Sequence, residues 1–571
     1  MTNYNYDNLN YNQPDLIPPG HDSDPDYYIP MYFAAPWVIA HGYRGTSDQY
    51  SYGWFLDNVS QSYTNTGDDA WAGQKDLAYM GAQCGPFDQH FVYEAGDGLE
   101  DVVTAFSYLQ GKEYENQGLN IRSAMPPKYV FGFFQGVFGA TSLLRDNLPA
   151  GENNVSLEEI VEGYQNQNVP FEGLAVDVDM QDDLRVFTTR PAFWTANKVG
   201  EGGDPNNKSV FEWAHDRGLV CQTNVTCFLK NEKNPYEVNQ SLREKQLYTK
   251  SDSLDNIDFG TTPDGPSDAY IGHLDYGGGV ECDALFPDWG RPDVAQWWGD
   301  NYKKLFSIGL DFVWQDMTVP AMMPHRLGDP VGTNSGETAP GWPNDKDPSN
   351  GRYNWKSYHP QVLVTDMRYD DYGRDPIVTQ RNLHAYTLCE STRREGIVGN
   401  ADSLTKFRRS YIISRGGYIG NQHFGGMWVG DNSSTEDYLA MMVINVINMN
   451  MSGVPLVGSD IGGFTEHDKR NPCTPDLMMR FVQAGCLLPW FRNHYDRWIE
   501  SKKHGKNYQE LYMYRDHLDA LRSFVELRYR WQEVLYTAMY QNALNGKPII
   551  KTVSMYNNDM NVKDAQNDHF L

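Results

Sequence analysis

The chain has 571 residues, 40% of them hydrophobic and 13% aromatic, so it is long enough for a large domain with insertions and too apolar for a disordered protein. Its formal net charge of −28 argues against a nucleic-acid or anionic-membrane surface, because phosphate groups bind clustered Lys and Arg. No apolar stretch approaches the roughly 20 residues of a membrane span, and no secretory signal opens the chain, so we expect a soluble protein.

The cysteines indicate a reducing environment. They form no CxxC pair and lack the histidine spacing of a zinc site. We therefore expect free, mostly buried thiols and an intracellular protein of the cytoplasm or a plastid, with any transit peptide outside these residues. The seven cysteines are Cys84, Cys221, Cys227, Cys282, Cys389, Cys473 and Cys486.

The amino-terminal region, residues 1 to about 125, differs in composition from the rest. It is rich in Tyr, Asn, Asp, Gly and Pro and contains short apolar runs such as YYIPMYFAAPWVIA and YSYGWFLDNVSQSY. Short aromatic runs between turn residues predict the strands of an antiparallel sheet.

Beyond Pro126, short apolar strands alternate with helical segments, which predicts parallel βαβ units. Eight such strands and a helical region to about 545 predict a (β/α)8 barrel, with polar, Gly-rich insertions near 229–280 and 325–375. A doubly wound open sheet is the alternative, but no GxGxxG follows the first strand. The predicted strands are 128–135, 173–180, 219–228, 310–317, 408–415, 425–431, 453–460 and 488–494, and the candidate helices include 156–165, 209–218, 294–309 and 436–450.

Polar side chains close six of these strands at the carboxyl end, where barrel enzymes build their active sites. A single aspartate after a strand commonly caps a helix or satisfies a loop, but six strands ending alike are hard to explain in that way. Metal binding is a competing interpretation, although no second histidine and no D-x-D-x-D-G loop accompanies the acids. The residues are Asp177, Asp179, Asp316, Arg415, Asp431, Asp460 and His494.

Several carboxylates and one arginine around a neutral substrate suit chemistry at a glycosidic bond. One carboxylate attacks the anomeric carbon and another protonates the leaving oxygen, with about 5 to 5.5 Å between them when configuration is retained. The remaining polar residues suit sugar hydroxyls, and tryptophan faces suit the apolar sides of pyranose rings.

The motifs around these residues resemble glycoside hydrolase family 31, the α-glucosidase family. FVWQDM at 312–317 resembles its nucleophile strand and MWVGDN at 427–432 its acid/base strand, while PPKYVFGFFQG, FEGLAVDVDM, LFPDW, IISR, VGSDIGGF and WFRNH agree in order across residues 30–571. The resemblance implies Asp316 as nucleophile, Asp431 as acid, an α-1,4-glucan substrate and no metal or cofactor. It also implies a subsite for the terminal glucose, formed by Asp177, Trp314, Met317, Arg415, Trp428, Asp460, Phe464 and His494.

One motif departs from the family. Hydrolases commonly continue the nucleophile motif as Asp-Met-Asn-Glu, whereas here Val319 occupies the glutamate position. With LFPDWGRPDVAQWW, SRGGYIGNQHFGGMWVGDN and LPWFRNHYDRW, this resembles the algal α-1,4-glucan lyase branch, which releases 1,5-anhydro-D-fructose from starch and glycogen by elimination. An apolar Val319 would exclude water from the pocket, and a site with less water favours Asp316 acting as a base over attack by water. The alternative is that the valine is only a packing variant.

Two other functions remain open at this stage: a retaining α-glucosidase of the same family, and a catalytically silent glucan-binding protein. The silent protein would be marked by loss of one acid, and both are present. The resemblance also implies three regions: the latter part of a β-sandwich at 1–125, the catalytic barrel at 126–545, and the start of a further β domain at 546–571. We therefore expect the chain to be part of a longer protein.

Overall fold

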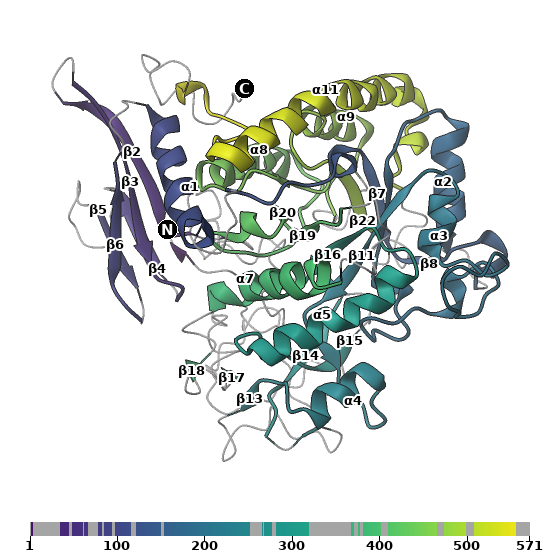
Figure 1. The fold of residues 1–571 in the computed structure, drawn as a ribbon. Coiled ribbons are helices and arrows are strands. Elements are labelled where there is room, and N and C mark those ends of the chain that lie inside the picture. Colours follow the sequence, from purple (N-terminus) through teal and green to yellow (C-terminus); the bar gives the residue numbers. More distant parts are fainter. Residues whose placement is uncertain are drawn as a thin grey trace, which may run out of the picture.

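The centre of the fold is a closed parallel barrel, flanked on one side by antiparallel sheets formed near the amino terminus (Figure 1). The computed structural model describes residues 2–3, 33, 35–44, 48–60, 62–66, 78–82, 85–93, 98–115, 122–149, 154–251, 265–266, 268–276, 281–318, 367–369, 375–376, 381–400, 409–464, 473–497 and 508–555. No helix in these ranges is both long enough and apolar enough to cross a bilayer.

Each barrel strand is parallel to its neighbour and follows it in chain order, and the last strand returns to pair with the first. A parallel bridge between Asp460 and Arg492 and a 3.2 Å hydrogen bond from the Trp490 amide to the Val457 carbonyl close the ring. The predicted barrel is confirmed, and the open doubly wound sheet is wrong. The strands are β7 (Phe134–Phe138), β10 (Gly173–Val176), β11 (Val220–Thr226), β16 (Phe312–Asp316), β19 (Ile412–Ser414), β20 (Gly426–Trp428), β21 (Val457–Gly458) and β22 (Arg492–Asp496).

Several predicted strands were too long, because local turns interrupt the apolar runs. The run 128–135 begins as a 3-10 turn, Lys128–Phe131, and the strand starts only at Phe134. The run 173–180 ends at Val176, where the Asp177 side chain accepts a 2.7 Å hydrogen bond from the Val178 amide and caps a further 3-10 turn. A polar residue at a strand end therefore also turns the chain.

Helices cover the barrel, and the amino-terminal caps of two of them can be recognised in the sequence. Ser156 with Glu159 and Ser209 with Glu212 form capping boxes, the Ser-x-x-Glu pattern that satisfies two free amides at a helix start. The helices that follow the barrel strands are α2 (Leu157–Asn166), α3 (Val210–His215), α5 (Pro292–Ser307), α7 (Arg381–Ser391), α8 (Glu436–Met451), α9 (Pro475–Gly485) and α11 (Leu518–Asn545).

The long helix α11 is fastened to the barrel by Arg528, whose guanidinium is fully buried. Its nitrogens donate to the backbone carbonyls of Phe131, Cys486, Leu488 and Pro489, which precede β7 and β22. Many of the large apolar side chains of the strands and helices form one continuous core around these contacts.

The first predicted insertion region contains an antiparallel sheet between β11 and α5. It is formed by β12 (Leu229–Lys230), β15 (Glu281–Leu285) and β14 (Ile271–Asp275), with α4 (Glu237–Glu244) beside it. A neighbouring sheet pairs β13 (Lys250–Ser251), β17 (Met367–Tyr369) and β18 (Asp375–Pro376). Most of the second predicted insertion, 325–375, and residues 556–571 of the predicted carboxy-terminal domain lie outside the described residues.

Two antiparallel sheets near the amino terminus confirm the predicted strand type. One pairs β2 (Trp37–Arg44), β3 (Asp48–Asp57) and β6 (Asp88–Val92), and the other pairs β1 (Thr2–Asn3), β4 (Ser62–Thr66) and β5 (Ala78–Ala82). A helix that was not predicted also lies there, α1 (Leu99–Glu115), which packs Val102 and Phe106 against Phe55 and Val92.

Six of the seven cysteines lie in described residues; all six are buried and form no disulfide, as predicted. Cys84 lies outside the described residues.

Candidate active site

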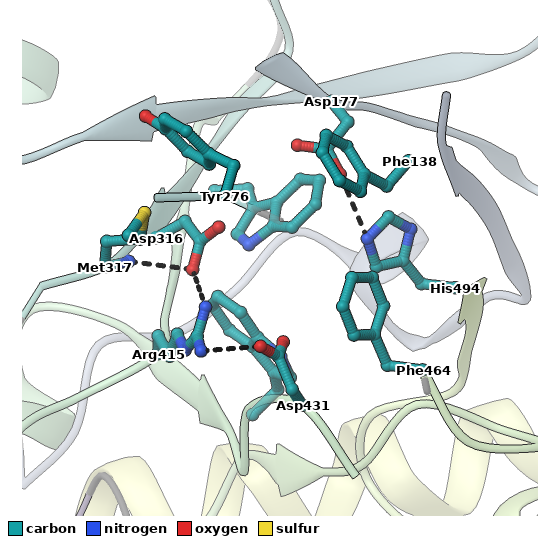
Figure 2. Close-up of a pocket in the computed structure, with 11 residues that line it drawn as sticks. Phe138, Asp177, Tyr276, Asp316, Met317, Arg415, Asp431, Phe464 and His494 are labelled. Carbon is teal, nitrogen blue, oxygen red and sulfur yellow. Dashed lines mark hydrogen bonds and ion pairs between the residues drawn. The ribbon is translucent and has the colours of Figure 1, made fainter. Parts of the chain in front are cut away.

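A pocket lies at the carboxyl ends of the barrel strands, where the sequence placed the polar residues (Figure 2). Its empty volume, which includes space open to solvent, is about 390 Å³. All the predicted site residues except Asp179, Asp460 and Val319 line the pocket, and Asp179 instead accepts a 2.7 Å hydrogen bond from the Gly139 amide. The lining is Phe138, Asp177, Tyr276, Trp314, Asp316, Met317, Arg415, Trp428, Asp431, Phe464 and His494.

Asp316 and Asp431 are bound to the two ends of a single guanidinium. Arg415 follows β19 and is 2% exposed; its Nη1 lies 2.7 Å from Asp316 Oδ1 and its Nη2 lies 2.8 Å from Asp431 Oδ2. The three side chains come from the ends of three consecutive strands, β16, β19 and β20, and Figure 2 shows them converging on one side of the pocket. Charge-assisted hydrogen bonds of this kind are strong and directional, so the two acids are held in fixed relative positions.

The Asp316 carboxylate has two further donors. The Met317 amide donates to Oδ1 at 2.7 Å, and the Asn224 amide nitrogen donates to Oδ2 at 2.9 Å. Met317 has φ of 53°, an unfavourable conformation for a side chain of this size, and its carbonyl accepts a hydrogen bond from the buried Cys227 thiol. Strained backbone at a functional site is commonly retained because it orients a reactive group, here the carboxylate at the strand end.

Asp431 is the acid of the pair that can hold a proton near neutral pH. Burial raises the pKa of Asp431 to about 6, against the opposing effect of the Arg415 charge, while the nearby Asp316 carboxylate raises it further. Desolvation disfavours the charged form of a carboxyl, and a general acid works best when its pKa is near the working pH. Asp431 therefore has the properties of a proton donor.

The opposite side of the pocket is formed by Asp177 and His494. His494 Nε2 lies 3.1 Å from Asp177 Oδ2, and the Phe464 ring stacks on the imidazole with 5.0 Å between ring centroids. The edge-on ring of Trp314, 4.9 Å away, holds the imidazole from another side. Hydrogen-bonding groups set among aromatic faces match the two kinds of surface that a sugar presents.

The structure places Asp460 behind the pocket rather than in its lining. It forms a fully buried bidentate pair with Arg492, with Oδ1 2.7 Å from Nε and Oδ2 3.0 Å from Nη2. The guanidinium of Arg492 in turn lies over the rings of Trp314, at 4.3 Å, and Trp428, at 4.9 Å. Asp460 therefore acts on the pocket through the tryptophans that Arg492 supports.

Three residues at the site were not predicted. Phe138 was missed because the first strand was placed several residues too early, and Tyr276 belongs to the insertion, where no pattern pointed to the pocket. Asn224 was not singled out by its residue type, because its strand also contains the polar residues Gln222, Thr223 and Thr226. The predicted tuning residue, Val319, lies outside the described residues.

No group of three or more His, Cys, Asp or Glu side chains in the part of the chain that the structure describes is arranged to hold a metal ion. The donors in the pocket instead pair with one another, as acid with arginine and acid with histidine.

A TIM barrel whose pocket presents two carboxylates on one arginine, among aromatic walls, has the arrangement of enzymes that act on glycosidic bonds. The comparison with known families agrees with this class. The model for the glycosyl hydrolases family 31 TIM-barrel domain matches residues 123–538. The chain belongs to glycosyl hydrolase family 31.

Comparisons with individual proteins give the nearer and the more distant relationships. The crystal structure of the Gracilariopsis lemaneiformis α-1,4-glucan lyase, a covalent intermediate complex with 5-fluoro-idosyl-fluoride, is 78% identical with a TM-score of 0.90, and the match covers 100% of this chain and 56% of that chain. Alpha-glucosidase 2 of Bacillus thermoamyloliquefaciens is 23% identical over 91% of this chain and 53% of its own length. Alpha-xylosidase 1 of Arabidopsis thaliana is 24% identical over 82% of this chain and 45% of its own length. The chain thus spans about half the length of these relatives.

Proposed function

We propose that this chain contains the catalytic barrel of an exo-acting α-1,4-glucan lyase. It would remove terminal glucose units from starch, glycogen or maltooligosaccharides as 1,5-anhydro-D-fructose. The observation that carries the proposal is the pair Asp316 and Asp431 on Arg415, in a chain 78% identical to a solved α-1,4-glucan lyase. A pocket at the carboxyl ends of the barrel strands, with aromatic residues among polar ones in its lining, can hold a terminal sugar unit.

In the first step, an oxygen of the Asp316 carboxylate attacks C1 of the terminal glucose. The bond from C1 to the glycosidic oxygen breaks, and Asp431 transfers its proton to that oxygen, so the shortened glucan leaves with a free hydroxyl. Arg415 contacts both acids and is placed to stabilise the carboxylate that Asp431 becomes. The product of the step is a glucosyl ester on Asp316.

In the second step, the ester is broken by elimination. Asp316 leaves C1 as a carboxylate and takes the proton from C2, and the C2–H electron pair forms a C1–C2 double bond. The resulting enol takes a proton at C1 and loses the proton of its C2 hydroxyl, which gives the ketone 1,5-anhydro-D-fructose. The aromatic residues Trp314, Trp428 and Phe464 line the pocket, and apolar walls of this kind disfavour attack by water at C1.

A retaining α-glucosidase is the second candidate function, and the names of the more distant relatives favour it. It would share the first step and differ only in the second, where Asp431 would remove a proton from water and water would attack C1. The two functions therefore use the same described residues. They differ only in whether the glucosyl ester on Asp316 is broken by elimination or by water.

We also propose a location inside the cell, in the cytoplasm or a plastid. The support is the set of six buried thiols that form no disulfide, which is usual for proteins in reducing compartments.

The test is the identity of the product. The protein is incubated with maltose and with amylose, and the released monosaccharide is identified by mass spectrometry. With amylose, 1,5-anhydro-D-fructose as the main product, which is lighter than glucose by one water, supports the lyase, whereas glucose as the main product supports the hydrolase. With maltose, a lyase releases one glucose for each 1,5-anhydro-D-fructose, whereas a hydrolase releases glucose alone. Asp316→Asn should abolish both products, and retained activity on maltose would contradict the assignment of the site.

A further inference from the structure

Asn224 connects two acids of the pocket without lining it. It lies on β11, and its Nδ2 donates to Asp177 Oδ1 at 2.8 Å and to Asp316 Oδ2 at 2.9 Å. Its side chain is buried, with 2% of the residue exposed. A side-chain amide nitrogen carries two hydrogens, so both are used on carboxylates.

The orientation of this amide is set by the two acids. Asn224 Oδ1 is buried and has no hydrogen-bond partner among the described residues. Rotating the amide by half a turn would point that oxygen at two carboxylates, which would repel it.

The two oxygens of Asp316 are held differently. Oδ1 accepts hydrogen bonds from Arg415 and the Met317 amide, whereas Asn224 is the donor that contacts Oδ2. Without that donor, the carboxylate would be held through Oδ1 alone and could tilt about its last side-chain torsion, which has a broad energy profile. The neutral donor also lies between Asp316 and Asp177, whose like charges would otherwise repel each other directly.

We propose that Asn224 is a positioning residue for the reaction: it fixes the Oδ2 side of the Asp316 carboxylate and links it to Asp177. The inference rests on the proposed role of Asp316 as nucleophile. Asn224 acts through that carboxylate, since it does not line the pocket.

Two substitutions separate hydrogen bonding from packing. Asn224→Leu keeps the branched shape and removes both donors. Asn224→Ala leaves a polar space in which a water molecule can donate to Asp177 and Asp316 in place of the amide. A positioning role therefore predicts that leucine is the more damaging substitution, while a packing role predicts that alanine is. Thr223→Val is the matched control, because Thr223 is buried on the same strand and donates to the Val176 carbonyl outside the pocket.

The measurement is the rate of covalent labelling of Asp316 by a 5-fluoro glycosyl fluoride, followed by mass spectrometry of the peptide that contains Asp316. Loss of a hydrogen bond to a charged group corresponds to roughly a 10- to 100-fold change, so we expect Asn224→Leu to lower the maximal labelling rate by about that factor. The reagent concentration at half-maximal rate should change less. Asn224→Ala should lose less, and Thr223→Val should label like the unsubstituted protein.

Labelling of Asn224→Leu at the unsubstituted rate, or a greater loss in Asn224→Ala, would overturn the role of Asn224 alone. Absence of label on Asp316 in the unsubstituted protein would overturn the proposed nucleophile as well. Thermal unfolding midpoints are measured for each variant. If Asn224→Leu does not fold, Asn224→Ala is compared with Thr223→Val: slower labelling at similar stability supports the role, and equal labelling overturns it.

Discussion

Asp431 and Asp316 are held by opposite nitrogens of the same buried guanidinium, at 2.8 Å and 2.7 Å from Arg415. The arrangement sets both the spacing and the charge of the two proposed catalytic groups. Burial raises the pKa of Asp431 in spite of the positive charge of Arg415 beside it. One acid can therefore act as a nucleophile while the other holds a proton.

Arg415→Lys should strongly reduce activity on maltose. A lysine ammonium is a point charge and cannot place two parallel donors on Asp316 and Asp431. Removing a preorganised donor from a reacting group commonly lowers kcat by roughly 100-fold or more, so we expect a loss of kcat/KM of at least about 100-fold. Arg480→Lys is the matched control, because its pair with Glu436 is exposed at the surface and should change kcat/KM less than about threefold. Near-normal activity in Arg415→Lys would show that the shared guanidinium is not needed.

The pH dependence of kcat/KM should report Asp431. As a general acid it must be protonated, and its pKa is about 6, so kcat/KM should fall as the pH rises through that value. Folding stability should follow the same sign. Because the folded pKa is raised above the ordinary value of 3.8, the folded state binds more protons between about pH 4 and 6, and the contribution of this group to the unfolding free energy falls as the pH rises through that window.

A substrate with a different leaving group provides the control for the pH profile. Glucosyl fluoride releases fluoride, which needs no proton from an acid. The fall of kcat/KM near pH 6 should therefore be present for maltose and absent for glucosyl fluoride. An identical fall with both substrates would assign it to a group other than Asp431.

Val319→Glu should shift the product from 1,5-anhydro-D-fructose toward glucose. The substitution adds a polar group close in sequence to Asp316, where hydrolases of the family commonly carry glutamate, and would admit water to the ester. The ratio of the two products is measured by chromatography, with Val319→Leu as the apolar control. An unchanged ratio in Val319→Glu would show that this position does not choose between the two routes.

Arg528→Met should destabilise the fold without acting on the chemistry. The substitution leaves carbonyls that precede β7 and β22 without their charged donor, in a fully buried place. Hydrogen bonds to charged groups contribute about 1.5 to 3 kcal/mol each, so we expect a loss of at least about 3 kcal/mol in denaturant unfolding. Arg530→Met, exposed on the same helix, should change stability by less than about 0.5 kcal/mol. Equal stability of the two variants would contradict the role of Arg528 as a fastener of α11.

The barrel was predictable because its signals are local. Apolar runs, helical spacing and Ser-x-x-Glu caps each depend on a few neighbouring residues, and acids at strand ends are brought together by the closure of the barrel. Strand bounds were less predictable, since the register of β7 and β22 and the turn at Asp177 are set by contacts with other strands. Helix α1 was missed although Leu99, Val102, Val103 and Phe106 have helical spacing.

The site was predictable where a residue ends a strand, as at Asp316, Arg415 and Asp431. It was not predictable where a role depends on a side chain from another element. Asp460 was expected to line the pocket, but its pairing with Arg492, from β22, places it behind the wall. Tyr276 reaches the pocket from an insertion, and the link that Asn224 forms between two acids depends on three neighbouring strands.

The most direct test of elimination is the reaction with amylose in deuterium oxide, followed by nuclear magnetic resonance of the product. If the ester on Asp316 is broken by loss of the C2 proton, the enol takes its new hydrogen from solvent. The product should then be 1,5-anhydro-D-fructose with one deuterium at C1. Glucose that retains its original hydrogens at C1 and C2 would contradict the proposed lyase.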